Sequence, residues 1–255
     1  MAAQGLLRAR LGRGQALRGL FVGIPSPALI EMAGHAGFDF VVIDNEHGPA
    51  SLETTEHLLR AAGSVGLAAI VRASGVEQRE ILRILDLGPA GIQIPQVNTA
   101  EQARDLVRFT HFPPEGMRGV AFSTRAAGFG FHGGAEYMQR VDSELQVVAH
   151  IETAEALANL DTLLAVDGID IWFIGPTDLS VSLGYPGQPA HPAVRQAIDD
   201  ALERIRRAGR IAGLMVTSAD DWHTCAQLGA RYITFPITML LGAAMRQLLD
   251  KLSTP

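Results

Sequence analysis

The sequence predicts a single (β/α)8 barrel with an extra helix at its N-terminus. Eight short apolar runs recur along the 255 residues, and each is followed by a segment with helical periodicity. The runs are continuously apolar rather than alternating, which is typical of parallel strands covered on both faces. A doubly wound open sheet is the alternative, but no glycine-rich phosphate fingerprint follows any strand. Because the chain contains no linker or low-complexity tract, residues 1–255 are expected to form one domain.

The elements follow one another in the order that this fold requires. Strands are predicted at residues 17–24, 38–44, 67–72, 90–95, 146–152, 169–175, 211–216 and 231–236. Helices are predicted at residues 1–15, 26–36, 52–65, 77–88, 99–111, 153–166, 191–209, 219–229 and 237–252. Thr99 and Gln102 have the spacing of a capping box at a helix start. The segment 112–145 is too long for an ordinary connection, so we expect it to be functional or to form an interface.

Charge and cysteine content exclude several classes of protein. The net charge of −6 argues against nucleic acid or an anionic membrane as the main partner. The single cysteine, Cys225, excludes an intrachain disulfide and a cysteine-based zinc cluster. No apolar run reaches the roughly 18 residues that a membrane span needs. The arginine-rich first residues resemble a transit peptide, but a strand begins near Leu17, so a cytoplasmic protein is expected.

Polar residues follow the predicted strands at the point where each strand ends. In a barrel, the carboxyl ends of the strands surround one mouth, and catalytic groups lie there. The second, third, fifth and sixth strands contribute Asp44, Glu46, His47, Arg72, His150, Glu152, Gly175, Pro176, Thr177 and Asp178. The sequence therefore predicts carboxylates, imidazoles and a guanidinium around one mouth.

Glu152 and Asp178 are candidate ligands for a divalent metal. Two carboxylates with open positions suit Mg²⁺ or Mn²⁺, which take further ligands from water and substrate. The alternative is structural, since Glu152 also begins a helix and Asp178 could cap a turn. Because the two carboxylates follow neighbouring strands, the metal interpretation is favoured.

Arg72 and His47 have two interpretations each, and the direction of the His150 side chain can be predicted. Arg72 either forms an ion pair with Asp44 or Glu46, or stabilises a developing oxyanion. His47 is a candidate general acid or base, although a lone loop histidine is more often an ordinary hydrogen-bonding residue. His150 alternates with Glu152, which directs both side chains to the same face of the strand.

Lysine usage excludes one kind of covalent catalysis. The only lysine is Lys251, and none follows any predicted strand. A Schiff-base mechanism requires a lysine amine at the reacting carbon, so it is excluded.

Four separated motifs resemble the HpcH/HpaI aldolase family. They are "DNEHGP", "IVR", "IETAEAL" and "FIGPTDLSVSLG", and they occur in the family's order and spacing. These proteins are class II, metal-dependent pyruvate aldolases with barrels of the phosphoenolpyruvate/pyruvate type. The resemblance implies cleavage or formation of 4-hydroxy-2-oxo acids through a pyruvate enolate, with pyruvate and an aldehyde as products.

The resemblance also implies roles for individual residues. Glu152 and Asp178 match the metal ligands, for Mg²⁺ or Mn²⁺ with Co²⁺ and Zn²⁺ as alternatives. His47 matches the catalytic base, and Arg72 matches the residue that stabilises the transition state. Asp86 matches the acid that raises the basicity of the histidine.

Further implications concern substrate binding and assembly. Asp44 lies in the loop of the catalytic histidine, and the segment from Gly175 through Pro176 and Thr177 to Asp178 matches the part that receives the substrate carboxylate. The family also forms hexamers in which a neighbouring subunit completes the site. The loop "RGVAFSTRAAGFG" is the candidate for that contribution, and a homo-oligomer, a hexamer or trimer of dimers, is expected.

Two positions depart from the family pattern. His150 stands where the family has a glutamine that contacts the keto acid, so this imidazole could donate to substrate, reach the metal or act as a second base. The last strand continues as "FPITMLL", where the family carries a Gly-Ser-Asp turn. These departures keep two alternatives open: a citrate-synthase-like or malyl-CoA-lyase-like enzyme that joins an acyl-CoA to a 2-oxo acid, and a non-catalytic keto-acid-binding barrel.

Overall fold

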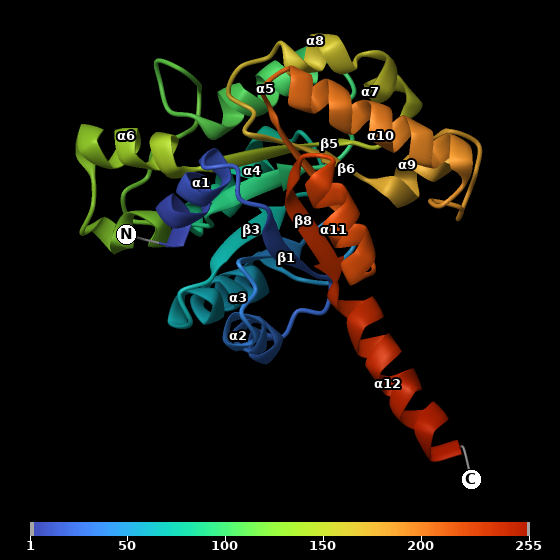
Figure 1. The fold of residues 1–255 in the computed structure, drawn as a ribbon. Helices are drawn as coiled ribbons and strands as arrows, with labels where there is room; N and C mark the ends of the chain where they lie inside the picture. Colours follow the sequence, from blue (N-terminus) through green and yellow to red (C-terminus); the bar gives the residue numbers. More distant parts are fainter. Residues whose placement is uncertain (1–2, 254–255) are drawn as a thin grey trace.

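The computed structural model describes residues 3–253 and contains eight parallel strands closed into a barrel (Figure 1). The strands are β1 Leu17–Val22, β2 Phe40–Asp44, β3 Ala68–Arg72, β4 Gly91–Ile94, β5 Gln146–Ile151, β6 Ile171–Ile174, β7 Ile211–Met215 and β8 Ala230–Pro236. Each strand pairs in parallel with the next, and β8 pairs with β1 to close the barrel. The predicted (β/α)8 fold and all eight predicted strands are confirmed.

Helices cover the outside of the barrel. They are α2 Pro27–Ala36, α3 Leu52–Ser64, α4 Gln78–Asp86, α5 Ala100–Thr110, α7 Ala154–Ala158, α8 Leu160–Leu164, α9 Pro176–Ser182, α10 Pro192–Arg207 and α11 Ala219–Gln227. The last helix, α12 Ile237–Ser253, follows β8. The capping box of Thr99 and Gln102 is present at the start of α5.

The structure differs from the predicted helices at α7, α8 and α9, and also at α6 (Gly134–Glu144), which lies where no helix was predicted. The helix expected at 153–166 is divided into α7 and α8 at Asn159, whose side-chain amide donates to the Asn98 carbonyl oxygen at 2.9 Å. The backbone of Asn159, with φ −90° and ψ 4°, departs from regular helical geometry, so the residue ends α7 and begins α8. The short helix α9 was not predicted, and Pro176 begins it at a position where the absent N–H costs nothing.

Side chains of the strands alternate between the lumen and the helices. On β2, Phe40 and Val42 belong to the cluster inside the barrel, whereas Val41 and Ile43 belong to the cluster under the helices. The next inward position is Asp44, the last residue of the strand. The same alternation on other strands therefore decides which of their residues reach the mouth.

Helix α1 (Ala3–Gly12) closes the lower end of the barrel, where the strands begin. Leu7 and Leu11 are almost fully buried and join the lumen cluster. Arg8 donates to the Leu145 carbonyl oxygen at 3.2 Å and pairs with Asp170, so it ties the helix to the starts of β5 and β6. The N-terminal helix predicted at 1–15 ends at Gly12, and residues 1–2 lie outside the described part.

The segment 112–145 forms a substructure beside the lower end. It contains a 3₁₀ turn at Arg125–Gly130 and helix α6 at Gly134–Glu144. Phe112, Ala127 and Tyr137 form a small hydrophobic cluster of their own inside it. We call residues 112–145 the excursion.

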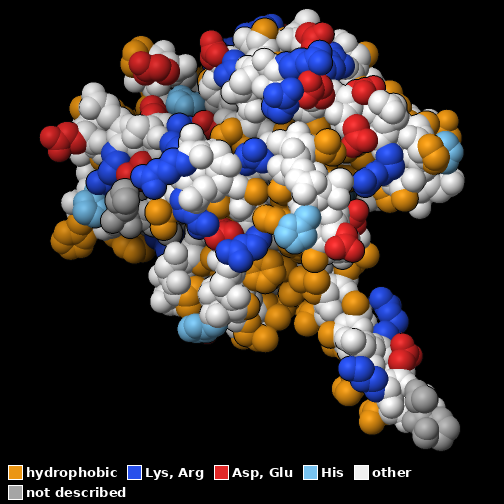
Figure 2. All heavy atoms as spheres, viewed as in Figure 1, with side chains coloured by type: hydrophobic (Ala, Val, Ile, Leu, Met, Phe, Trp, Pro, Cys, Tyr) orange, Lys and Arg blue, Asp and Glu red, His pale blue; other side chains and the backbone are white. Residues whose placement is uncertain are grey.

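Helix α12 projects away from the barrel (Figure 1). Hydrophobic side chains gather where it leaves the barrel and continue along it (Figure 2). Its exposed apolar residues are Met239, Leu240, Met245, Leu248, Leu249 and Leu252. Among residues 3–253, no helix combines the length and the apolar composition needed to cross a membrane.

Gly91 marks a place where the barrel wall leaves no room for a side chain. A Cβ atom there would lie 2.4 Å from the Gln146 carbonyl oxygen and 2.7 Å from Ile70 Cδ1. The Gln146 carbonyl belongs to the backbone of β5, which pairs with β4, so it cannot move without disturbing the sheet. Close approach of the backbones therefore requires glycine at this position.

We predict that Gly91→Ala lowers the free energy of unfolding by about 1–3 kcal/mol, because overpacking forces the paired strands apart. Urea denaturation followed by circular dichroism measures the change. Gly63→Ala in α3 is the matched control, since a Cβ there meets nothing within 4 Å. It should leave stability unchanged or raise it by up to about 1 kcal/mol. Equal stability of the two variants would contradict the packing argument.

Candidate active site

The carboxyl ends of four neighbouring strands bring the predicted polar residues to one mouth. Asp44 on β2 is in register with Arg72 on β3, and Arg72 is in register with Gln93 on β4. The fifth strand contributes His150 and continues to Glu152. Each of these residues occupies an inward position of its strand, so their side chains meet inside the barrel.

Arg72 and Asp44 form a buried, bidentate ion pair. The Arg72 Nε donates to Asp44 Oδ1 at 2.9 Å, and Nη2 donates to Oδ2 at 2.8 Å. The Phe21 ring lies 4.6 Å from the guanidinium carbon, which adds a cation–π contact. The predicted ion pair of Arg72 is therefore present, and the paired planes hold the guanidinium in one orientation.

Glu46 connects this pair to His47. Its Oε2 accepts the third contact of Arg72, from Nη1 at 2.8 Å, and its Oε1 lies 3.8 Å from His47 Nε2. Burial raises the pKa of the Glu46 carboxyl, and this effect outweighs the charges of Arg72 and His47, which lower it. The loop after β2 thus carries a proton-accepting carboxylate between a fixed cation and an imidazole.

A tight turn positions the His47 side chain at the mouth. Asp44 Oδ1 accepts the backbone N–H groups of Glu46 at 3.1 Å and His47 at 3.2 Å. A Cβ atom on Gly48 would lie 2.1 Å from the Asp44 carbonyl oxygen, so the turn requires glycine. The His47 side chain itself is 66% exposed, which leaves its ring open to a substrate.

Glu152 is buried, and its two oxygens contact the His150 imidazole and a backbone N–H rather than an arginine side chain. Its Oε2 lies 2.7 Å from His150 Nδ1, and its Oε1 accepts the Gln96 backbone N–H at 2.8 Å. Burial alone would raise the pKa of Glu152, but His150, Gln96 and the charge of Arg72 together lower it. The carboxylate is therefore charged and fixed. The predicted proximity of His150 and Glu152 is confirmed by this direct contact.

Two residues that the sequence analysis did not single out extend this contact into the lumen. Gln93 Nε2 lies 2.6 Å from His150 Nε2, and the Tyr232 hydroxyl donates to Gln93 Oε1 at 2.9 Å. Both side chains are fully buried. An amide inside an otherwise apolar strand run, "AGIQIP", is the sequence signal that could have indicated Gln93.

The donor set at the mouth fits a hard divalent cation. Asp178 lies exposed in the first turn of α9, and within residues 3–253 its carboxylate has no hydrogen-bond partner. A Cβ on Gly175 would lie 2.5 Å from Glu152 Oε2, so glycine keeps that carboxylate accessible. In the described part of the chain, no group of three or more His, Cys, Asp and Glu side chains has metal-binding geometry. A metal here would be held by two carboxylates, and its other ligands would be water and substrate.

Asp86 lies at the other end of the barrel from His47. It is the last residue of α4, just before β4 begins, whereas His47 follows the end of β2. Asp86 Oδ1 is 3.9 Å from Nη2 of the buried Arg118, and burial raises the pKa of Asp86 although Arg118 acts to lower it. One chain therefore does not bring Asp86 to its own His47.

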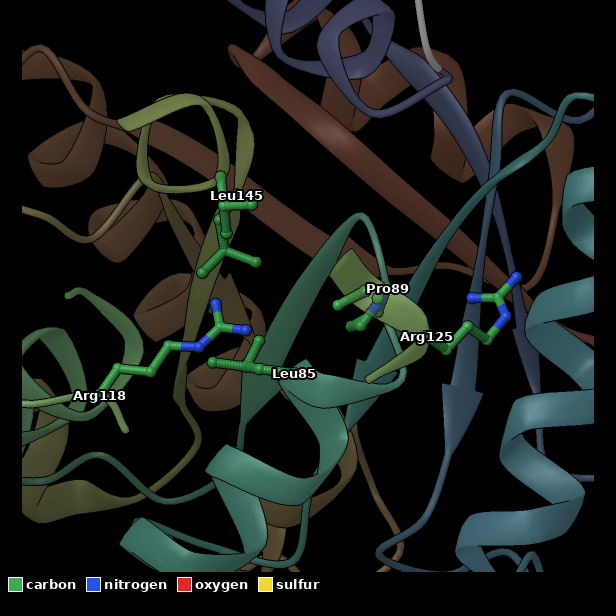
Figure 3. A pocket seen from close by; sticks show the side chains of 8 residues that line it. Leu85, Pro89, Arg118, Arg125 and Leu145 are labelled. Atoms are coloured by element: carbon green, nitrogen blue, oxygen red, sulfur yellow. The ribbon is translucent and has the colours of Figure 1, made fainter. Parts of the chain in front are cut away.

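A cavity of about 240 Å³ lies at this lower end, between α4 and the excursion. Figure 3 shows Arg118 turned toward Leu85 and Leu145, two of its apolar lining residues. Arg125 also lines the cavity, and its Nη1 donates to the Leu87 carbonyl oxygen at 2.6 Å. The cavity is thus separate from the mouth where the predicted catalytic groups gather.

Comparisons with known proteins identify sequences and structures to which the chain is similar. The sequence profile of the HpcH/HpaI aldolase/citrate lyase family matches residues 17–240. A hydroxypyruvate/pyruvate aldolase of Pseudomonas aeruginosa is 36% identical over 94% of this chain and 90% of its own length. A 2-keto-3-deoxy-L-rhamnonate aldolase of Escherichia coli K12 is 38% identical over the same shares.

Solved structures of similar proteins have the same fold. An HpcH/HpaI aldolase/citrate lyase family protein from Burkholderia cenocepacia superposes with a TM-score of 0.92, at 31% identity, over 98% of this chain and 100% of its own. The citrate synthase SbnG superposes with a TM-score of 0.84, at 29% identity, over 96% of this chain and 98% of its own.

We predict that Asp44→Asn lowers the free energy of unfolding by about 3 kcal/mol, because it leaves the buried Arg72 charge with only Glu46. Chemical denaturation of both proteins measures the difference. Asp161→Asn is the matched control: Asp161 also pairs with an arginine, Arg204 at 2.9 Å, but its side chain is 81% exposed. The control should cost less than about 1 kcal/mol. A cost for Asp44→Asn no larger than for the control would contradict a structural role for the pair.

Proposed function

The chain belongs to the HpcH/HpaI aldolase/citrate lyase family, and from that premise we propose that it is a metal-dependent pyruvate aldolase. Its reaction is the cleavage or formation of 4-hydroxy-2-oxo acids, with pyruvate and an aldehyde as the two fragments. The observation that carries the proposal is a fixed, charged Glu152 carboxylate at the same mouth as the buried Arg72 guanidinium. The first suits a metal that binds a 2-oxo acid, and the second suits an enolate oxygen.

Glu152 and Asp178 are the proposed metal ligands. Their oxygens suit Mg²⁺ or Mn²⁺, with Co²⁺ and Zn²⁺ as alternatives. When bound, the ion supplies Lewis acidity at the 2-oxo group of the substrate. Gly175, Pro176 and Thr177 precede Asp178 in the segment proposed to receive the substrate carboxylate, and Thr177 and Asp178 are exposed in the first turn of α9.

Arg72 is proposed to stabilise the charge that develops on the enolate oxygen. A guanidinium stays protonated throughout the reaction and loses no energy to reorientation when it is already fixed. Asp44 supplies that fixation through its two hydrogen bonds to Arg72. Asp44 and Arg72 therefore act as one unit.

His47 is proposed to move the proton. In the cleavage direction, it accepts the proton of the 4-hydroxyl while the C3–C4 bond breaks and the aldehyde leaves. The electron pair of that bond forms the pyruvate enolate, and protonation at C3 then gives pyruvate. The exposed ring of His47 and its contact with Glu46 support this role, since a base must reach the substrate and release its proton again.

An acyl-CoA reaction is the second candidate function. The last strand passes directly into α12 through Pro236 and Ile237, where the family pattern has a polar turn, and the fold is similar to that of the citrate synthase SbnG. Enolate chemistry at a 2-oxo acid is common to both candidates, but the condensation partner differs. A non-catalytic keto-acid-binding barrel is the third, and the complete set of Glu152, Asp178, Arg72 and His47 argues against it.

We also propose that the working form is a cytoplasmic homo-oligomer, a hexamer or trimer of dimers. Six exposed leucines and methionines on the projecting α12 support this, because exposed apolar surface on a projecting helix is typical of a protein–protein contact. In such an assembly, Asp86 of one subunit would raise the basicity of His47 of its neighbour. The excursion would accompany Asp86, since Arg118 of the excursion lies beside it.

We predict that the protein exchanges the methyl protons of pyruvate for deuterium in D₂O when Mg²⁺ or Mn²⁺ is present. Proton NMR of pyruvate measures the exchange, and no knowledge of the aldehyde is needed. EDTA should abolish it, and Glu152→Gln should slow it by at least about 100-fold, because a metal ligand contributes several kcal/mol to enolate formation.

The control is Glu155→Gln, which makes the same change to an exposed carboxylate in the first turn of α7. It should exchange at the wild-type rate. Exchange that persists in EDTA, or at full rate in Glu152→Gln, would exclude the metal mechanism. Exchange together with turnover that requires an acyl-CoA would favour the second candidate function.

We predict that mixing two inactive variants restores activity if the site is shared between subunits. His47→Ala and Asp86→Asn should each lose most aldolase activity. When they are co-expressed, some sites combine the intact His47 of one subunit with the intact Asp86 of another. Activity of the co-purified mixture and its mass by light scattering are the measurements.

The control is a mixture of His47→Ala with Arg72→Ala, two residues from the same mouth. It should stay inactive, because no site in that mixture has both groups intact. Failure of the His47→Ala and Asp86→Asn mixture to regain activity, in an oligomer of mixed composition, would exclude a shared site.

A further inference from the structure

A continuous network of hydrogen bonds runs from the lumen of the barrel to Glu152. It consists of the Tyr232 hydroxyl, the Gln93 amide, the His150 imidazole and the Glu152 carboxylate, at successive separations of 2.9, 2.6 and 2.7 Å. We call these four side chains the lumen network. None of them is more than 3% exposed. Water therefore does not compete for these hydrogen bonds, and each group depends on its neighbours in the network.

Tyr232, at the lower end of the lumen network, determines which group donates and which accepts in each hydrogen bond. The Tyr232 hydroxyl is fully buried, and the hydrogen bond that it makes runs to the side-chain oxygen of Gln93. It donates to Gln93 Oε1, which leaves the Gln93 amide nitrogen facing His150 Nε2. An N–H donor requires a lone pair on the imidazole, so Nε2 is the acceptor and Nδ1 carries the hydrogen. That Nδ1–H then donates to Glu152.

The other tautomer does not fit the same contacts. With the hydrogen on Nε2, the imidazole would face the Gln93 amide nitrogen with a second donor, and its Nδ1 lone pair would face the Glu152 carboxylate. Both contacts would be repulsive at these distances. The Phe173 ring stacks on His150 with 4.7 Å between centroids and a 29° interplanar angle, which also prevents the imidazole from turning away.

The Glu152 carboxylate is confined from two further directions. Gln96, whose backbone N–H is bonded to Oε1, has a φ of 51°, a left-handed conformation that non-glycine residues rarely adopt. Residues held in such conformations are typical of functional sites, where the surrounding structure enforces them. On the other side, Gly175 approaches Oε2 so closely that a Cβ would lie 2.5 Å away.

We propose that Tyr232, Gln93 and His150 are positioning residues for Glu152: they fix its carboxylate in one orientation by locking His150 as the Nδ1–H tautomer. The role of that carboxylate as a metal ligand rests on the function proposed above. His150 then neither binds the metal nor acts as a second base, because its Nε2 lone pair is occupied by Gln93 and its Nδ1–H by Glu152. Each Glu152 oxygen retains a second lone pair for the metal.

The tautomer of His150 is the first measurement, and it uses the metal-free protein. Long-range ¹H–¹⁵N NMR distinguishes a protonated from an unprotonated ring nitrogen, and His150→Asn identifies the signal by its loss. Wild type should show hydrogen on Nδ1 alone. Tyr232→Phe removes only the hydroxyl that orients Gln93, so it should produce a mixture of tautomers. Tyr185→Phe is the matched control, since Tyr185 lies outside the network and stacks on His191.

The second measurement is the affinity for Mn²⁺, determined by titration calorimetry. His150→Phe keeps a ring that can stack on Phe173 but removes the donor to Glu152, so it should weaken binding about 10–100-fold. His150→Asn replaces the donor with an amide N–H near the Nδ1 position and should restore binding to within a few fold of wild type. Tyr232→Phe should weaken binding in the same direction as His150→Phe, and Tyr185→Phe should not change it.

The outcomes separate this proposal from the proposed function. Wild-type His150 with hydrogen on Nε2, or on both nitrogens, would overturn the positioning proposal even if Mn²⁺ binds and pyruvate exchanges. Unchanged Mn²⁺ affinity in a folded His150→Phe or Tyr232→Phe would overturn it as well. A wild type that binds no Mn²⁺ but shows the Nδ1–H tautomer would overturn the metal-dependent function and leave the orientation of Glu152 supported.

Discussion

The two-residue alternation of a closed parallel barrel is the constraint on which the rest of this structure depends. Because inward and outward positions alternate strictly along each strand, Phe40 and Val42 fill the lumen of β2, and Asp44 must reach the mouth. On β3 the same alternation places Ala68 and Ile70 in the lumen and Arg72 at its end. A shift of one residue in either strand would direct the ion pair into the apolar layer under the helices. Fold and site are therefore specified by the same register.

The two buried carboxylates at the mouth, Asp44 and Glu152, are stabilised in different ways. Asp44 is neutralised by the guanidinium of Arg72, so this pair contributes little net charge. Glu152 instead receives N–H donors from His150 and Gln96, which stabilise its negative charge without cancelling it. Glu152 has no arginine partner of its own, so it is a better candidate for a metal ligand than the paired Asp44. This difference explains why the loop after β2 carries acids that are not the proposed metal ligands.

The sequence predicted the parts of the structure that repeat and missed the parts that depend on contacts between distant residues. Continuous apolar runs with turns between them indicated all eight strands, and the polar residues at their ends indicated His47, Arg72, His150 and Glu152. At the break between α7 and α8, the side chain of Asn159 bonds to Asn98, which lies in another connection. No local pattern reports such a contact.

The site residues that the sequence analysis missed were missed for the same reason: their roles depend on contacts between distant residues. Gln93 and Tyr232 are uncharged residues 139 positions apart, and they become a pair only because β4 and β8 face each other across the lumen. Tyrosine is also common in strands for packing reasons alone, so its hydroxyl gave no separate signal.

The position of Asp86 could not be predicted without the direction of helix α4. This helix returns to the lower end of the barrel, opposite the mouth. In the proposed assembly, the lower end of each subunit contacts the mouth of a neighbouring subunit, and its own mouth is contacted by a neighbour's lower end. Because closed symmetry repeats that contact for every subunit, the number of complete sites equals the number of subunits, and a separate chain has none.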